Sequence, residues 1–359
     1  MHRAGFLWDK LISDSNIRIA IFAVNQGHRT HKKSGKPNKI TEWVEETIDD
    51  RVEELRKFME DDDFQFSPTR DFIVYDKSAG KFREIHEPKQ WPDQYLHHCL
   101  IQVLMPVMMR GMDYWCVGSI KGRGAKHGTD GIKKWMHTDP KGTRWCLEAD
   151  IKKFYDSLMA QVVIDDFSTR LVKDQKIIWF IRKMLKYGIY IGAYFSQWFA
   201  NTVLQPIDQM IRDMGASHYV RYMDNFTIFA TSKKKLHKIR KALSTALAKM
   251  GLRLKENWQI FKVDKRPVTA MGYRFGHDFC MLRKRNVLRV KRQLKRYYRK
   301  PPKCASLHTA QSLISRLGQF KHCDNLSVFS KHYKKGTMAN LKNTVRSENE
   351  LQIRTRQDL

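Results

Sequence analysis

Two aspartates, Asp150 and Asp224, have the residue type and the position needed for metal-assisted chemistry at phosphorus. Asp150 ends the apolar segment WCLEA, and Asp224 lies with Asn225 at the tip of a predicted β-hairpin, between two apolar runs. Carboxylates at neighbouring strand ends can hold Mg²⁺, which prefers hard oxygen ligands and takes its remaining ligands from water and substrate phosphates. Two aspartates so far apart in a sequence are weak evidence alone, so the residues around them decide the interpretation.

The spacing of apolar residues predicts the elements that must position these aspartates. Residues 1–30 have a helical apolar face, and Thr41 is the expected N-cap of the next helix. Residues 71–88 alternate as two strands around the turn KSAG. A mostly buried helix begins near residue 92, and Pro106 is expected to kink or divide it. From residue 145 strands, Gly-containing loops and helices alternate, which predicts an α+β fold whose sheet brings distant acids together.

Composition indicates a polyanionic partner. The 359 residues carry a formal charge of +30 with a pI near 9.9, and 42% of them are hydrophobic, enough for a substantial core. Residues 283–300 hold ten Lys or Arg and no acid around a helical apolar stripe. The alternative is a solvated helix face, but unbroken positive charge repels itself along a helix unless phosphates neutralise it.

The six cysteines are scattered without a C-x-x-C pair, so we expect buried free thiols in a reducing compartment. The N-terminus has no apolar signal region, and no run approaches membrane-spanning length. We therefore expect a cytoplasmic protein without a membrane partner. The cysteines are Cys99, Cys116, Cys146, Cys280, Cys304 and Cys323.

A series of motifs, in order, resembles the reverse transcriptases. LEADIKKFYDSL is similar to palm motif A, GIYIGAYFSQWFAN to motif B and RYMDNF to the Y-x-D-D of motif C. KGRGAKHG resembles a fingers segment, GLRLKENWQ motif D and VTAMGYRF motif E, and SRLGQFKHCDN resembles a thumb pattern of prokaryotic enzymes. The motif B form I-G-x-x-x-S-Q is similar to that of diversity-generating retroelements and of some phage-defence reverse transcriptases.

The resemblance implies a right-hand polymerase with fingers, a palm with an antiparallel sheet, and a helical thumb. The expected divisions are an N-terminal segment with fingers over residues 1–140, the palm over 141–280, a basic helical thumb over 281–335 and a polar C-terminal tail over 336–359, of which residues 346–359 are expected to be frayed. The implied activity is RNA-directed DNA synthesis with two Mg²⁺ ions, or Mn²⁺. Asp150 and Asp224 are then the catalytic metal ligands, with Asn225 and the Ile151 carbonyl as further ligands.

The resemblance also assigns nucleotide-binding residues. Lys81 and Arg83 match the fingers strand that holds the triphosphate, although Arg83 could instead pair with Glu84 or Glu87. Tyr155 matches the steric gate against a ribose 2′-hydroxyl, or is a buried palm tyrosine. The other assigned residues are Ile191, Gly192 and Gln197 at the nascent base pair and Lys255 as a proton donor to pyrophosphate, while the nucleic-acid contacts are Arg123, Arg289, Lys291, Arg292, Lys295 and Arg296.

Asn225 leaves three functions open. Asparagine tolerates the left-handed turn conformation, but it supplies one negative charge fewer than the second aspartate of Y-x-D-D. The first function is cDNA synthesis from a specific bound RNA, as in diversity-generating retroelements. The second is an antiphage-defence enzyme that makes DNA from a non-coding RNA or without a conventional template, and the third is a weakly catalytic RNA-binding scaffold. Expected partners are template or non-coding RNA, DNA primer and product, dNTPs, and a small accessory protein or second subunit.

Overall fold

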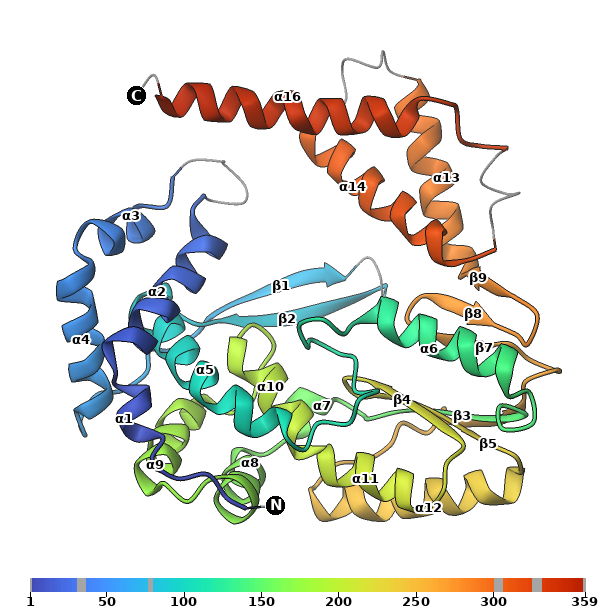
Figure 1. Ribbon diagram of the computed structural model, residues 1–359, viewed down its shortest axis with the longest axis horizontal. Coiled ribbons are helices and arrows are strands. Elements are labelled where there is room, and N and C mark those ends of the chain that lie inside the picture. The colour runs from blue at the N-terminus through green and yellow to red at the C-terminus, as the bar shows by residue number, and fades with distance from the viewer. Residues whose placement is uncertain (1, 31–36, 77–79, 300–305, 325–330, 358–359) are drawn as a thin grey trace.

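The computed structural model describes residues 2–30, 37–76, 80–299, 306–324 and 331–357 (Figure 1). It has the α+β right-hand arrangement that the sequence predicts. Helices and a projecting hairpin form the fingers, a four-stranded antiparallel sheet backed by helices forms the palm, and a basic helical unit forms the thumb.

In the described part of the chain, the fingers begin with four helices, and the N-cap of the third differs from the prediction. Thr41 is not an N-cap: Asn38 caps the helix, its side chain accepting a hydrogen bond from the Ile40 amide. Thr41 is buried one turn inside the helix, where its hydroxyl donates to the carbonyl of His28. The helices are α1 (Trp8–Leu11), α2 (Asp14–His28), α3 (Lys39–Glu46) and α4 (Ile48–Glu60).

The fingers hairpin forms as predicted, from β1 (Arg70–Asp76) and β2 (Lys81–Glu87) in antiparallel register. Residues 77–79 of its expected turn lie outside the described residues. Most side chains of β1 are exposed, because the hairpin projects from the body of the molecule (Figure 1). Its base is held by a bond from the His86 amide to the Ile191 carbonyl at 2.9 Å.

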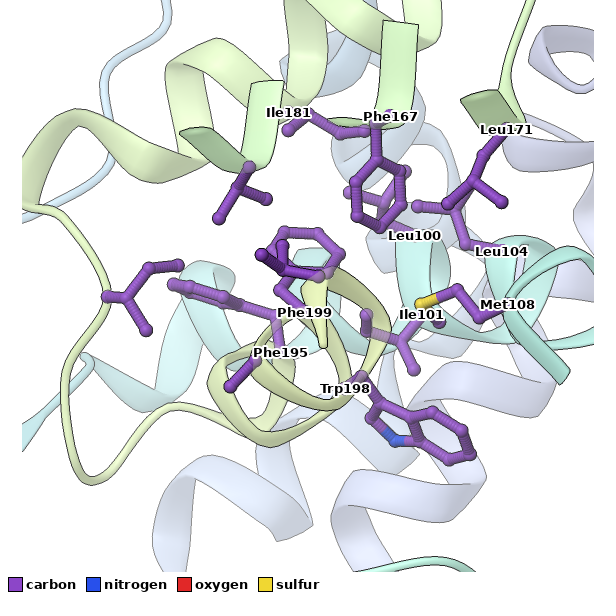
Figure 2. Close-up of a cluster of buried hydrophobic side chains, with 14 of the residues drawn as sticks. Leu100, Ile101, Leu104, Met108, Phe167, Leu171, Ile181, Phe195, Trp198 and Phe199 are labelled. Carbon is purple, nitrogen blue, oxygen red and sulfur yellow. The ribbon is translucent and has the colours of Figure 1, made fainter. Parts of the chain in front are cut away.

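Helix α5 (Tyr95–Met109) runs through Pro106 without being divided. Pro106 lies in the last turn, and the helix ends three residues later, so few backbone bonds are affected. Figure 2 shows Leu100 and Leu104 of α5 in one buried cluster with Phe195 and Phe199 of α10 (Tyr194–Val203). These side chains are fully buried, and each contributes roughly 1.5–3 kcal/mol of hydrophobic stabilisation. This core fixes the helix that follows the motif B loop.

The palm sheet has the strand order β4-β5-β3-β6, and all its pairs are antiparallel. Helices α11 and α12 cover one face of the sheet (Figure 1). The strands are β3 (Trp145–Asp150), β4 (His218–Tyr222), β5 (Asn225–Ala230) and β6 (Gln259–Lys262); the other helices from α6 to α12 are α6 (Ala125–Thr138), α7 (Phe154–Ser157), α8 (Ala160–Asp166), α9 (Gln175–Met184), α11 (Gln205–Asp213) and α12 (Lys233–Lys249).

The thumb follows a three-stranded sheet and ends in a long helix. Residues 346–357 are helical, whereas the sequence analysis predicts a frayed end there. Met338, Leu341 and Val345 recur at helical spacing, and Leu341 is buried in the thumb core, so the first turns of this helix, before residue 346, pack against the thumb. The strands are β7 (Val268–Ala270), β8 (Tyr273–Phe275) and β9 (Cys280–Leu282), and the helices are α13 (Lys284–Tyr298), α14 (Leu307–Gly318) and α16 (Thr337–Gln357).

The cysteine prediction is confirmed for the described residues. Cys99, Cys116, Cys146, Cys280 and Cys323 are buried free thiols, and Cys304 lies outside the described residues. Within the described part of the chain, no helix has both the length and the apolar character required to span a membrane.

Candidate active site

The structure places Asp150 and Asp224 side by side. Asp150 is the last residue of β3, and Asp224 lies in the two-residue turn between β4 and β5. The Ile151 amide donates to the Asp224 carbonyl at 3.2 Å, which ties the strand end to the turn. Burial and the neighbouring charge of Asp150 raise the pKa of the Asp224 carboxyl to about 6. Like charges held this close favour a bound cation.

Asn225 does not occupy the left-handed position of this turn, so that interpretation of its role is wrong. Met223 does, with φ of +55°, and Asn225 is the first residue of β5, opposite both Asp150 and Tyr222. The Asn225 amide nitrogen donates to Asp224 Oδ1 at 3.0 Å. Asn225 therefore acts on the carboxylate of Asp224 directly, and its own side chain is exposed.

Lys255 contacts the other aspartate. Its Nζ lies 2.5 Å from Asp150 Oδ1, and its backbone amide donates to the Asp150 carbonyl at 2.8 Å. The ammonium group thus provides positive charge at the carboxylate pair. Two carboxylates, one with a raised pKa and the other paired with a cation, are a donor set that fits divalent metal ions. Ile151, whose carbonyl is the expected extra ligand, forms a β-bridge with Leu254 beside them.

A cavity of about 530 Å³ between the fingers hairpin and the palm collects several of the expected nucleotide-binding residues. Lys81, Arg83, Tyr155 and Ile191 all line it. Arg83 does have an acidic partner, but it is Asp76 across the hairpin, with Nε 2.8 Å from Oδ2, and not Glu84 or Glu87. The guanidinium is still partly exposed and can exchange that carboxylate for a phosphate.

Tyr155 lies between the aspartates and the fingers. Its side chain is half-buried and lines the cavity, so it is not a fully buried palm residue. Burial and the charge of Asp224 raise the pKa of its hydroxyl, whereas the charge of Arg83 lowers it. The Tyr155 hydroxyl is therefore close enough to both Asp224 and Arg83 for each charge to act on it.

Gly192 is required by a contact with the fingers hairpin. Its φ is +131°, and a Cβ there would lie 2.2 Å from the His86 carbonyl oxygen. The glycine thus lets the motif B loop meet the backbone of β2. Of the three motif B residues expected at the nascent base pair, Ile191 lines the cavity. Gly192 and Gln197, which is exposed, are not among the described residues that line it.

A second cavity, of about 510 Å³, is bordered by Asp150. Asp150 and Asn225 line it from the palm, Gly272 from the turn between β7 and β8, and Arg283 and Arg285 from the start of the thumb. The sequence analysis does not assign these two arginines a site, although both belong to its basic run. Arg285 also approaches the fingers: its Nη1 lies 3.8 Å from the position that a Cβ on Gly80 would take.

The basic residues assigned to nucleic acid fall into two groups. Arg123 is partly engaged, because its Nη1 donates to the Asp113 carbonyl at 2.7 Å and its guanidinium lies 5.5 Å from the Tyr114 ring centre. The others are on α13, and in the described part of the chain no ion pair involves them. Arg292, Lys295 and Arg296 are exposed, and Arg289 and Lys291 are half-buried.

Similar proteins were found among curated proteins and solved structures. The chain is 25% identical over 205 residues to the uncharacterized 91 kDa protein in the cob intron of Schizosaccharomyces pombe. The match covers 53% of this chain and 24% of that protein, so the chain spans about a quarter of the relative's length.

Two solved telomerase structures are also similar. Apo telomerase from Candida tropicalis is 14% identical with a TM-score of 0.49, and the match covers 94% of this chain and 79% of that one. Telomerase from Candida albicans, in complex with a TWJ fragment of telomeric RNA, is 13% identical with a TM-score of 0.44, covering 78% and 58%.

One family model matches more than half of the chain. It is described as reverse transcriptase (RNA-dependent DNA polymerase), and it matches residues 75–275. The matched segment contains strand β2 of the fingers hairpin, the palm sheet, both aspartates and the motif B loop. The chain therefore belongs to the reverse transcriptase (RNA-dependent DNA polymerase) family.

Proposed function

We propose that this protein is an RNA-directed DNA polymerase that copies a specific bound RNA into cDNA. One observation carries the proposal: Asp150 and Asp224 lie side by side, next to a cavity lined by Lys81, Arg83 and Tyr155, in a chain of the reverse transcriptase family. The substrates are dNTPs, an RNA template and a DNA primer.

Asp150 and Asp224 would hold two Mg²⁺ ions, with the Ile151 carbonyl and the Asn225 amide oxygen as further ligands. When bound, the ions activate the primer 3′-hydroxyl and stabilise the leaving pyrophosphate. Lys255, whose ammonium group lies 2.5 Å from Asp150 Oδ1, would be placed to donate a proton to the leaving pyrophosphate.

The remaining residues bind and orient the nucleotide. Lys81 and Arg83 hold the triphosphate, Arg83 after leaving Asp76, since a guanidinium fork suits phosphate oxygens. The Tyr155 ring lies beside the sugar and excludes a 2′-hydroxyl. Ile191, Gly192 and Gln197 support the new base pair from the motif B loop. Arg123 and the basic residues of α13 hold the phosphates of template and primer.

Substitution of the aspartates tests this proposal. Asp150→Ala and Asp224→Ala are expected to abolish nucleotide incorporation in primer extension while RNA binding stays near the wild-type level. Asp278→Ala removes an exposed carboxylate from the loop between β8 and β9 and is a matched control that retains activity. Normal extension by either aspartate variant would refute the two-metal assignment.

The same assay separates the biological roles. Sequencing the product of the wild-type protein distinguishes cDNA of a specific RNA, as in diversity-generating retroelements, from the short or untemplated DNA of an antiphage-defence enzyme. One observation favours the weakly catalytic RNA-binding scaffold: Asn225, in place of an aspartate, removes a negative charge from the proposed metal site. An accessory protein or second subunit would act by supplying the RNA or the primer.

A further inference from the structure

A buried charge network lies behind the turn that carries Asp224. Arg221 on β4, Asp208 on α11 and Tyr219 are fully buried. Arg221 Nε and Nη2 donate to the two carboxylate oxygens of Asp208 at 2.7 and 2.6 Å, and the Tyr219 hydroxyl donates to the same carboxylate at 2.5 Å. Two charges buried this deeply are tolerated only where every polar atom has a partner.

The other donors of Arg221 reach beyond its acid. Nη1 donates to Asn201 Oδ1 at 2.9 Å and to the Met223 carbonyl at 3.0 Å, and Nη2 also reaches the Asn201 carbonyl at 3.3 Å. All five N–H groups of the guanidinium therefore have acceptors. The bond to Met223 is distinctive, because Met223 is the left-handed residue directly before Asp224.

Residues 115–118 contact the same turn and the strand before it. The Val117 amide donates to the Arg221 carbonyl, and the Arg221 amide donates to the Trp115 carbonyl, so this segment runs along β4. Asn201 Nδ2 donates to the Gly118 carbonyl at 2.8 Å. A Cβ on Gly118 would lie 2.7 Å from the Met223 amide nitrogen, so only a glycine allows this approach.

We propose that Arg221 is a positioning residue for the catalytic turn: by holding the Met223 carbonyl it fixes the backbone that presents Asp224 to Asp150. A non-glycine residue in the left-handed region is strained and persists only where its surroundings enforce it. The charge-assisted bond from Arg221 supplies that enforcement. The inference rests on the proposed function, because it concerns how the proposed metal ligands are held.

The mechanism predicts which property changes when the bond is lost. Without it the turn relaxes and the distance between the two carboxylates varies, so metal binding weakens. Lys81, Arg83 and Tyr155 do not belong to the turn, so the KM for dNTP at saturating metal stays near the wild-type value. A purely structural role would lower protein stability and leave metal affinity per folded molecule unchanged.

The test measures the Kd for Mn²⁺ binding to the whole protein without nucleotide. Free Mn²⁺ is quantified by its electron paramagnetic resonance signal. Arg221→Lys keeps the charge beside Asp208 but cannot reproduce five fixed donors, and it is expected to raise the Kd for Mn²⁺ at least tenfold. Tyr219→Phe removes a bond to the same buried carboxylate and keeps the contact with Met223, so its Kd is expected to equal that of the wild type.

A second variant covers failure of the lysine variant to fold. Arg221→Met with Asp208→Leu and Tyr219→Phe removes both charges together, which is tolerated better than leaving one buried charge unpaired. It is expected to show the same loss of Mn²⁺ affinity with wild-type near-ultraviolet circular dichroism. Wild-type affinity in either folded variant overturns the role of Arg221.

Asp224→Asn distinguishes failure of the positioning role of Arg221 from failure of the proposed metal site. If Asp224→Asn weakens Mn²⁺ binding and the folded Arg221 variants do not, the positioning role fails and the metal site stands. If Asp224→Asn leaves Mn²⁺ binding unchanged, the metal assignment itself fails, and the positioning role fails with it.

Discussion

Asn225 occupies the position of the second aspartate in the Y-x-D-D pattern that the sequence resembles, and the structure shows what its side-chain amide contacts. Its nitrogen donates to Asp224 Oδ1, whereas a carboxylate at the same place would repel Asp224. The amide thus stabilises the ionised form of one ligand while removing a charge from the site as a whole. In the proposed two-metal site we expect the missing charge to have the larger effect on metal affinity, because two divalent cations would have to be neutralised.

We therefore predict that the wild-type protein is active but needs high Mg²⁺ or prefers Mn²⁺, whose affinity for such ligands is generally greater. Asn225→Asp should retain activity and lower the Mg²⁺ concentration that gives half the maximal rate of primer extension. A titration of both metals in both proteins measures this. If the wild type is inert with every metal and Asn225→Asp becomes active, the RNA-binding scaffold is the better description.

The pKa of Asp224 predicts a pH-dependent gain of stability when its charge is removed. Because burial and Asp150 raise this pKa from 3.8 to about 6 in the folded state, ionised Asp224 disfavours folding of the metal-free protein above pH 6. Asp224→Asn should raise the melting temperature at pH 7.5 in the presence of a chelator. The gain should shrink as the pH falls through 6 and vanish below about 4, where both states are protonated.

Thermal unfolding at several pH values checks the sign of this effect. Asp278→Asn, at an exposed carboxylate, is the control and should shift the melting temperature equally little at each pH. A destabilised Asp224→Asn variant at pH 7.5 would contradict the strained carboxylate pair.

At the scale of elements, the fingers hairpin depends on the motif B loop. Gly192→Ala would place a methyl group 2.2 Å from the His86 carbonyl, and the obstacle is backbone, so it cannot rotate away. We predict a loss of roughly 1–3 kcal/mol in stability and an increased KM for dNTP, because β2 carries Lys81 and Arg83. Gly336→Ala is the control, since it has φ of +85° but open space, and it should leave the KM unchanged.

Helix α13 gives a prediction about salt. Replacing Arg289, Lys291, Arg292, Lys295 and Arg296 by glutamine should weaken RNA binding and flatten its dependence on salt, by roughly 0.7–0.9 in the log–log slope for each lost phosphate contact. The slope is measured by fluorescence anisotropy between low and physiological salt.

Helix α12 provides the matched control for α13. Five exposed lysines lie on it, and it covers the face of the palm sheet away from the thumb (Figure 1). Replacing them by glutamine removes the same charge and should leave the slope nearly unchanged. Equal slopes for the wild type and the α13 variant would show that α13 faces solvent or a protein. The lysines are Lys233, Lys234, Lys238, Lys241 and Lys249.

Across the whole molecule, local patterns predicted local structure well. Alternation predicted the hairpin over 71–88, and the apolar runs around Asp150 and Asp224 predicted the strand ends that meet in the palm. The errors are also local: Thr41 was favoured as a cap over Asn38, and the apolar stripe that includes Leu341 was overlooked. Thr41 and Asn38 both satisfy the short-range rules for a helix cap, so only the fold decides between them.

The contacts that complete the site could not be predicted from the chain alone. Gly192 meets a carbonyl of a strand more than a hundred residues earlier, and Arg221 reaches a carbonyl whose position depends on a turn. Such contacts are set by how the elements pack, and apolar periodicity carries no information about them.

The approach of Arg285 to Gly80 has a consequence for the shape of the site. Arg285, at the start of the thumb, lies near Gly80 of the fingers hairpin and also lines the cavity that Asp150 borders. Fingers, palm and thumb therefore meet at this cavity. A shift of the thumb relative to the fingers would change the space beside Asp150 without any change in the palm.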